Sequence, residues 1–493
     1  MICLLTVFLV CSAHVGSPDV WYDGPAGPYS IRVLVRPPKV VPGLADIMVR
    51  VRGGAQSVRV APARWDTGAE GTPPPDSAQP VRGDPELYHA QLWLMARGAY
   101  RIVVTIDGVH GPGTTIVPVM ATAEQRFAVP YGLSGLLISA TVFLFFGLIT
   151  LVGAAVRESV LAPGDEPGEG RKRGARVAML VAVPVAVLLL FGGWMWWNAV
   201  DNAHRELLDR PWDAMATATG SSAGSRLLTL EITDTIWTRR HSEPLARRFP
   251  QNALLPDHGK LMHMFLVREG DLAGFAHVHP VTRDSVRFTV ALPSLPAGNY
   301  HVFADLVHES GATHTIVARA TLADSSSATG ISPVADLPAA DPDDAAWTGP
   351  AVGTMTSPTT TLASGATMRW SIPQRIRVEQ ETDLTVEVVD AQGAPVPLET
   401  YMGMPAHAMI QKDDGSVFVH LHPMGTISMA AQQALRVARD KATTMSHGAS
   451  AADSRVTFPY AFPKPGRYRV WIQVQQNGRV MTGAHDLTVI ASE

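Results

Sequence analysis

Residues 401–430 read YMGMPAHAMIQKDDGSVFVHLHPMGTISMA, and this stretch predicts a β-hairpin. Asp414-Gly415 is a strong signal for a tight turn, and it lies between two largely apolar runs. A two-residue turn at this point pairs residues whose numbers sum to 829, so His407 should lie opposite His422. His420 precedes His422 by two residues, and both rings should therefore share one face of the strand.

The opposite face of that strand carries Val417, Val419 and Leu421, which we expect in the core, with the histidines on the outer face. Imidazole suits copper, zinc and nickel, whereas thioether sulfur selects Cu(I) over zinc. Methionines surround the hairpin, so we expect a copper ion, Cu(I) or Cu(II), with zinc possible. The expected ligands are His407, His420 and His422, completed by one of Met409, Met402, Met404 and Met424.

A second stretch, HGKLMHMFLVREGDLAGFAHVHP at residues 258–280, repeats the pattern. His263 precedes the His277-Val-His279-Pro280 sequence by 14 residues, and the midpoint between His263 and His279 falls at Asp271 in a polar turn. The sequence therefore predicts a second metal site from His263, His277 and His279. No carboxylate accompanies either triad closely enough to suggest hydrolytic zinc chemistry. A linker rich in Ser, Ala, Asp and Pro separates the two stretches, so we expect two independent sites that store or relay the ion.

Composition and the N-terminus bound the possible functions. The chain has 493 residues and a net charge of −4, which gives no indication of nucleic-acid binding. Its two cysteines, Cys3 and Cys11, lie within MICLLTVFLVCSA, which resembles a secretory signal peptide cleaved after Ala13. A mature chain without cysteine has no disulfide, no thiolate nucleophile and no blue-copper centre.

Two uncharged segments, Leu133–Val156 and Val177–Val200, are each long enough to span a bilayer. The loop between them is basic, with Arg157, Arg171, Lys172, Arg173 and Arg176, so we expect it on the cytoplasmic side. The rest of the chain would then lie on the extracytoplasmic, periplasmic side of a bacterial inner membrane.

The fold expected is mainly β, with three immunoglobulin-like sandwiches and two transmembrane helices. The three sandwiches share a Gly-x-Tyr signature, at Tyr100, Tyr300 and Tyr468, which is similar to the tyrosine corner of such sandwiches. The expected boundaries are residues 1–13 for the signal peptide, 14–130 for the first sandwich, 131–156 and 177–200 for the helices, 157–176 for the cytoplasmic loop, 201–225 for a linker, 226–322 for the second sandwich, 323–346 for a second linker and 347–493 for the third sandwich.

The two histidine stretches, together with LPAGNYHVFADLVHESG and FPKPGRYRVWIQV, resemble bacterial envelope proteins of the YtkA/FixH-like kind. The N-terminal module, with AHVGSPDVWYDGPAGPY, is similar to YtkA-like domains as well. This resemblance implies small β-sandwiches in a copper-handling setting. Copper-resistance sandwiches of the CopC type suggest one further site, a histidine brace formed by His14 at the mature N-terminus and His110.

Three functions follow from these observations. The first is a membrane-anchored, non-enzymatic protein that sequesters, delivers or senses copper through His/Met sites. The second is an envelope scaffold that binds a partner protein. The third is a copper oxidase working at a histidine brace on the first module.

Overall fold

The computed structural model describes residues 14–15, 19–65, 67, 71–125, 129–162, 164–205, 210–220, 226–235, 237–238, 254–308, 310–323, 339–437 and 453–492. The chain is mainly β, as predicted, with three sandwiches and two long apolar helices. It divides into two compact units, residues 1–122 with 211–493 and residues 123–210. The predicted signal peptide, residues 1–13, lies outside the described residues.

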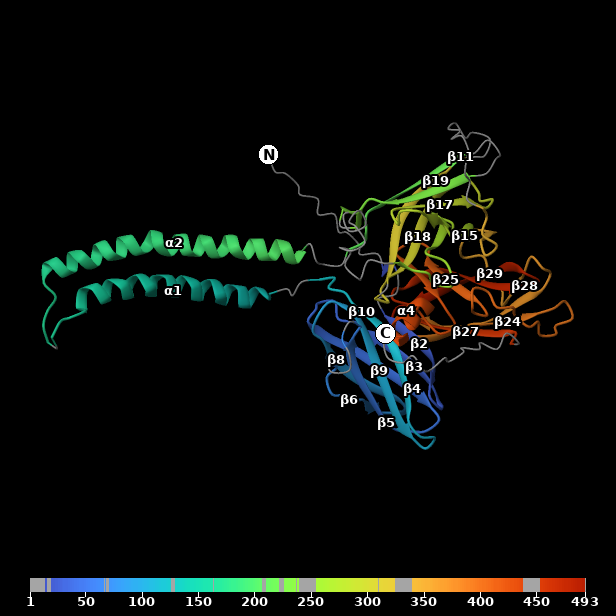
Figure 1. The fold of residues 1–493 in the computed structure, drawn as a ribbon, viewed down its shortest axis with the longest axis horizontal. Coiled ribbons are helices and arrows are strands. Elements are labelled where there is room, and N and C mark those ends of the chain that lie inside the picture. The colour runs from blue at the N-terminus through green and yellow to red at the C-terminus, as the bar shows by residue number, and fades with distance from the viewer. Residues whose placement is uncertain are drawn as a thin grey trace. The chain divides into compact units, whose positions relative to one another are not determined.

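The first sandwich is built from residues 20–121 (Figure 1). One sheet has the order β2-β3-β4-β8-β7 and the other β10-β9-β5-β6. Valines at alternate positions of both sheets, such as Val33, Val49, Val60 and Val104, are fully buried between them. The strands are β2 (Val20–Ala26), β3 (Tyr29–Arg36), β4 (Gly43–Arg52), β5 (Ala55–Arg64), β6 (Asp76–Ser77), β7 (Gln79–Val81), β8 (Asp84–Leu94), β9 (Gly98–Gly108) and β10 (Gly113–Ala121).

The second sandwich extends beyond residues 226–322 at both ends. Ala214–Gly220 (β11) pairs with β12, and Ala345–Thr348 (β20) pairs with β15, although the sequence suggested linkers at both places. Its sheets have the orders β11-β12-β17-β16 and β13-β18-β14-β15-β20, with β19 on β18. The remaining strands are β12 (Arg226–Ile232), β13 (Leu254–Leu255), β14 (His263–Arg268), β15 (Gly274–Val278), β16 (Val281–Thr282), β17 (Arg287–Leu292), β18 (Gly298–His308) and β19 (Thr313–Leu322).

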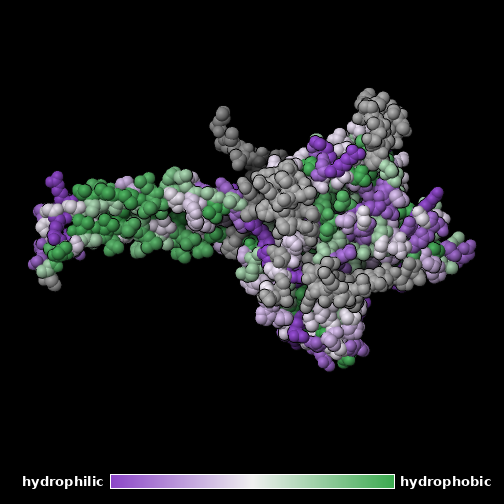
Figure 2. All heavy atoms as spheres, viewed as in Figure 1, coloured by the Kyte–Doolittle hydropathy of each residue, from purple (hydrophilic) through white to green (hydrophobic). Residues whose placement is uncertain are grey.

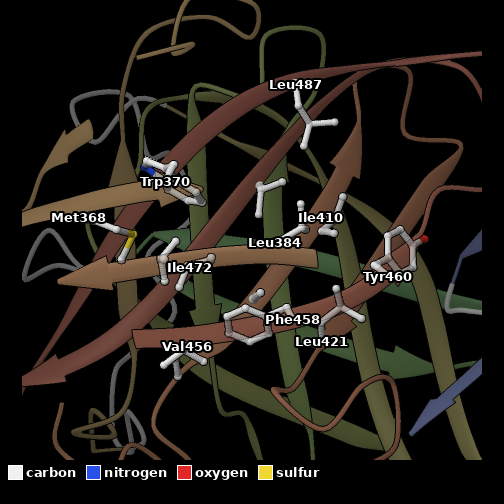
Figure 3. Close-up of a cluster of buried hydrophobic side chains, with 14 of the residues drawn as sticks. Met368, Trp370, Leu384, Ile410, Leu421, Val456, Phe458, Tyr460, Ile472 and Leu487 are labelled. Atoms are coloured by element: carbon white, nitrogen blue, oxygen red, sulfur yellow. The ribbon is translucent and has the colours of Figure 1, made fainter. Parts of the chain in front are cut away.

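The third sandwich pairs the sheet β1-β26-β25-β28-β29-β23 with the sheet β21-β22-β24-β27. Figure 3 shows the side chains between them, among them Trp370, Ile410, Leu421, Phe458 and Ile472. Met429–Val437 forms the helix α4 within this module. The strands are β1 (His14–Val15), β21 (Thr359–Thr361), β22 (Thr367–Ser371), β23 (Ile376–Arg377), β24 (Glu381–Val389), β25 (His407–Lys412), β26 (Val417–Leu421), β27 (Arg455–Ala461), β28 (Gly466–Gln476) and β29 (Arg479–Ile490).

Each sandwich contains the predicted tyrosine corner. The hydroxyl of Tyr100 donates to the carbonyl of Ala96 at 3.0 Å. Tyr300 and Tyr468 likewise donate to the carbonyls four residues earlier, at 2.8 and 2.7 Å. The repeated Gly-x-Tyr signature therefore marks the same local structure three times.

The second and third sandwiches pack against each other through the faces of β14, β15 and β18 and of β25, β26 and β28. Apolar side chains from both form one buried cluster, in which Phe303 stacks on Phe418 at 4.0 Å and Phe275 on Trp471 at 4.8 Å between ring centroids. The buried guanidinium of Arg469 pairs with Asp486 at 2.7 Å and also donates to the carbonyl of Leu272 in the second sandwich. These two sheets are therefore covered on both faces.

The helices α1 (Tyr131–Glu158) and α2 (Glu169–Arg205) run side by side in opposite directions (Figure 1). Both are long and apolar enough to cross a membrane, and their surface is almost continuously hydrophobic in Figure 2. Each is longer than the uncharged segment from which it was predicted. Helix α2 includes residues 169–176 of the predicted loop and residues 201–205 of the predicted linker.

Candidate metal centre

Both histidine hairpins have the predicted register. Met409 pairs with His420 and Ala408 with Leu421, so residue numbers sum to 829 as expected. In the second sandwich Met264 pairs with Val278, which sets His263 opposite His279. In each hairpin, therefore, the lone histidine and the His-x-His pair share one face, and Val417, Val419 and Leu421 occupy the core on the other.

The expectation of two independent sites is wrong for this structure. Both histidine faces are turned toward each other across the interface between the second and third sandwiches, and their rings are buried rather than solvated. For example, the ring of His420 lies 5.5 Å from His263, and that of His407 lies 6.5 Å from His277. The histidine cluster consists of His258, His263, His277, His279, His407, His420 and His422.

The first triad is the predicted set His263, His277 and His279, whose ligand nitrogens all lie within 4.8 Å of one another. Three nitrogens bound to one ion at about 2.0–2.1 Å lie roughly 3.3–3.6 Å apart, so only a small contraction is needed. All three residues are buried: His263 lies in β14, His277 lies in β15, and His279 directly follows β15. The second sandwich alone supplies this triad.

The second triad differs from the prediction by one residue. His407 and His422 are joined by His258 of the second sandwich, again with ligand nitrogens within 4.8 Å. The predicted third member, His420, lies close to both, with ring centroids 5.6 Å from His407 and 4.6 Å from His422. His420 stands between the two triads, where it can complete either one.

A strained turn directs His258 toward the third sandwich. His258 has φ = 53° and Gly259 φ = 82°, and residues 257 and 260 exchange two backbone hydrogen bonds across the turn. A positive φ is uncommon for a residue with a side chain, although histidine adopts it more often than most residues. Asp257 anchors this turn to the third sandwich, because its carboxylate accepts the backbone N–H of Ala430 in α4 at 2.9 Å.

Hydrogen bonds orient four of the rings through one nitrogen. The Nδ1 atom of His277 lies 2.9 Å from Oε1 of Gln473, that of His279 lies 2.9 Å from Oδ1 of Asp344, and that of His422 lies 3.1 Å from the carbonyl of Ile427. In His263 the Nε2 atom has this role, at 3.2 Å from the carbonyl of Asp257. Such partners fix the tautomer and direct the other nitrogen toward a metal.

The remaining nitrogens of the first triad therefore carry lone pairs. Nδ1 of His263 faces Nε2 of His277 at 3.1 Å, although the hydrogen bonds to Asp257 and Gln473 already use the one N–H of each neutral ring. Nε2 of His279 is buried without a hydrogen-bond partner among the described residues. In the second triad, Nε2 of His422 and both nitrogens of His407 likewise have no hydrogen-bond partner within the described chain, whereas Nε2 of His258 lies 3.8 Å from the carboxylate of Asp257.

Burial favours the neutral form of five of the rings. It lowers the pKa of His263, His277, His407 and His422 well below the ordinary value of 6.5, and the neighbouring imidazoles add to this effect. Burial also lowers the pKa of His258, against an opposing influence of Asp257. Neutral imidazole is the form that binds a metal ion.

The predicted methionine ligands have different surroundings. Met409 is fully buried in the apolar cluster between the sandwiches, across the strand pair from His420. Met402 and Met404 are buried in the turn that precedes β25, whereas Met424 contacts the first sandwich, since its carbonyl accepts the N–H of Asp23. A Cβ atom added to Gly403 would lie within 4 Å of both Nδ1 of His258 and the sulfur of Met429, so these two atoms lie near the same point.

The two residues of the predicted brace lie in different sandwiches. The backbone of His14 pairs in parallel with Val417 at the edge of the third sandwich. His110 lies in the turn between β9 and β10 of the first sandwich, with its ring 6.1 Å from Tyr29. The structure therefore does not bring His14 and His110 together.

Two features of the site escaped the sequence analysis. Carboxylates do accompany the triads: Asp344 contacts His279, and Oδ2 of Asp305 lies 3.4 Å from Nδ1 of His420. His258 stands five residues before His263, in a His-Gly pair typical of a turn, and this was the available signal. Asp344 ends the acidic sequence Asp341-Pro-Asp-Asp, which was assigned to a linker.

One family profile matches this region, and its description gives no activity. The profile of a domain of unknown function, DUF8832, matches residues 234–323 and 360–491, which include all seven histidines of the cluster. A single profile thus spans the second and third sandwiches together. None of the curated proteins compared with the chain matches it.

Among solved structures, the chain is similar to the native conformation of alpha-2-macroglobulin from E. coli, with 11% identity and a TM-score of 0.21 over 98% of this chain and 24% of that one. Dimeric latent PorU from Porphyromonas gingivalis has 8% identity and a TM-score of 0.15 over 92% and 32%. MtrC from Shewanella baltica has 11% identity and a TM-score of 0.16 over 61% and 71%. The chain thus spans about a quarter to a third of the first two proteins, and TM-scores this low support no conclusion about function.

Proposed function

We propose that this chain is a membrane-anchored metal-binding protein whose metal centre is the histidine cluster between the second and third sandwiches. Its role would be to sequester, deliver or sense the ion rather than to turn over a substrate. Helices α1 and α2 would anchor it in a bacterial inner membrane, with the sandwiches on the extracytoplasmic side, because the segment between the apolar spans is basic.

One observation carries this proposal: Nδ1 of His263 and Nε2 of His277 lie 3.1 Å apart, and both carry lone pairs when Asp257 and Gln473 accept the one N–H of each neutral ring. Two buried acceptors at this distance repel each other unless a cation or a proton lies between them. The lowered pKa of both rings disfavours the proton. The spacing is close to that of two nitrogens bound to one metal ion, and Nε2 of His279 supplies a third lone pair.

Copper is the ion that this ligand set favours. Imidazole nitrogens suit both copper and zinc, but soft sulfur near the second triad favours Cu(I) there. Met429, whose sulfur lies with Nδ1 of His258 beside Gly403, and Met409, which pairs across the strands with His420, are candidate sources of such sulfur. The first triad has only imidazole ligands, so it would accept Cu(II) or Zn(II) as well. Two adjoining triads predict two ions per chain.

The test is metal stoichiometry and affinity of the purified full chain in detergent, measured for Cu(I), Cu(II) and Zn(II) by competition with chromogenic chelators. We expect about two tightly bound copper ions in the parent. His263→Ala should remove one and His407→Ala the other, whereas His89→Ala, in the first sandwich, should remove neither. The proposal is wrong if the parent binds no copper, or if a chain with His407, His420 and His422 all changed to Ala still binds two copper ions as tightly as the parent.

A further inference from the structure

The residues Asp341, Asp343 and Asp344 form an acidic rim beside the first triad. Asp341 and Asp343 are partly exposed, whereas the side chain of Asp344 is largely buried. The third sandwich holds residues 341–344 in place, because the hydroxyl of Tyr401 donates a hydrogen bond to the carbonyl of Asp343 at 3.1 Å. The rim therefore leads from solvent toward the buried histidines.

His279 joins this rim to the first triad. One ring nitrogen of His279 lies within 4.8 Å of carboxylate oxygens of Asp341 and Asp344, and the same ring also belongs to the group with His263 and His277. Asp344 accepts from the backbone N–H of His279 as well as facing its Nδ1, both at 2.9 Å. Meanwhile Nε2 of His279 is buried with no partner in the described part of the chain. One imidazole is thus shared by a carboxylate-rich group and an all-histidine group.

A lysine currently occupies the cation position of the rim. Nζ of Lys260 lies 2.5 Å from Asp341 and 2.9 Å from Asp343, so its ammonium group neutralises part of the rim. Lys260 ends the turn that carries His258, the residue contributed by the second sandwich to the second triad. An ion that displaced Lys260 from the carboxylates would therefore act on the turn that holds His258.

We propose that Asp341, Asp344 and His279 form a loading site for a divalent transition-metal ion on its way to the first triad, with Lys260 held there until the ion displaces it. Carboxylate oxygens bind a hydrated divalent cation more readily than buried imidazole does, because a partly exposed site requires less dehydration. Passing the ion from this mixed site to His263 and His277 exchanges oxygen ligands for nitrogen ligands, and the ring of His279 belongs to both groups. This inference rests on the proposed metal-binding function and adds the route by which the centre fills.

The test uses Co(II) as a visible probe, mixed rapidly with the metal-free full chain in detergent at low salt. Asp341→Asn should slow loading by about tenfold, because removal of a carboxylate weakens attraction of the cation, and salt should slow the parent toward the variant. The equilibrium dissociation constant should change by no more than about threefold, since the final ligands are intact. Lys260→Met should load faster than the parent, because it removes the competing ammonium. Glu231→Gln, a loss of the same charge on the other sheet of the second sandwich, is the matched control.

The possible outcomes separate this inference from the proposed function. Unchanged loading rates in both Asp341→Asn and Asp343→Asn, with tight binding by the parent, would overturn the loading site and leave the metal centre standing. A loss of equilibrium affinity in Asp341→Asn as large as that in His263→Ala would make Asp341 a permanent ligand and also overturn the inference. No Co(II) or copper binding by the parent would refute the proposed function itself.

Discussion

Changing His407 to leucine should stabilise the metal-free protein and weaken its response to metal. The ring of His407 is fully buried, and neither of its nitrogens has a hydrogen-bond partner among the described residues. A buried polar group without a partner costs about 1–3 kcal/mol, and leucine has a similar volume without polar atoms. The substitution also removes the edge contact with Tyr401, at 5.0 Å between ring centroids, and this loss offsets roughly 1 kcal/mol of the gain. The net expected gain is therefore about 0–2 kcal/mol.

With copper bound, the parent should be more stable than the His407→Leu chain, the reverse of the order expected without metal. At a free copper concentration a hundredfold above the dissociation constant, each site adds about 2.7 kcal/mol to the free energy of unfolding. The parent has two such sites and the His407→Leu chain keeps only the first triad, so its metal-dependent gain should halve. Thermal unfolding of the full chain, with chelator and with copper, measures both quantities.

Val419→Ala is the matched control, because Val419 lies on the opposite face of the same hairpin and is buried in the core of the third sandwich. This change should lower stability by on the order of 2 kcal/mol with and without metal, and leave the metal-dependent gain unchanged. A His407→Leu chain that is less stable than the parent without metal, and gains as much from copper, would refute the reasoning.

Four further outcomes are expected. Arg469→Met should lower the unfolding free energy by about 3–5 kcal/mol in denaturant titrations, because it leaves the buried carboxylate of Asp486 without its counter-charge. Tyr468→Phe should cost about 1 kcal/mol in the same assay, the value of one hydrogen bond to the carbonyl of Lys464. Reporter fusions at Gly220 and at the C-terminus should both report an extracytoplasmic location, and a cytoplasmic signal would reverse the proposed topology. Burial lowers the pKa of His314, whose ring stacks on Trp212 at 4.4 Å, to about 4. The stabilisation from the neutral His314 ring is therefore complete above pH 6.5 and is lost as the pH falls toward 4. His314→Phe should show a flatter pH profile of stability.

Local features of the fold could be predicted from the sequence because local chemistry determines them. The Asp414-Gly415 turn fixes the pairing of β25 with β26, and with it the common face of His407 and His420. The Gly-x-Tyr signature likewise depends on a contact only four residues away. These predictions required no knowledge of how one sandwich packs on another.

The composite centre could not be predicted in the same way, because it depends on two surfaces that are distant in sequence. A signal was nevertheless present in strand composition. The strand HMFLVR is apolar on both faces, with Phe265 and Val267 beside His263, and VFVHL places Phe418 beside His420. Strands with two apolar faces are typical of sheets covered on both sides. This pattern argued against a solvated histidine face.

The division of ligands between the sandwiches changes what the pair can do. The first triad lies wholly within the second sandwich, but the second triad needs His258 from the second sandwich together with His407 and His422 from the third. The third sandwich alone therefore lacks a complete triad. An ion in the second triad would also join the two sandwiches, so its binding free energy would add to the stability of their interface. A relay between modules that move freely on a linker does not fit this geometry. Transfer between two adjoining sites within one rigid interface does, with His420 between them as a ligand available to both.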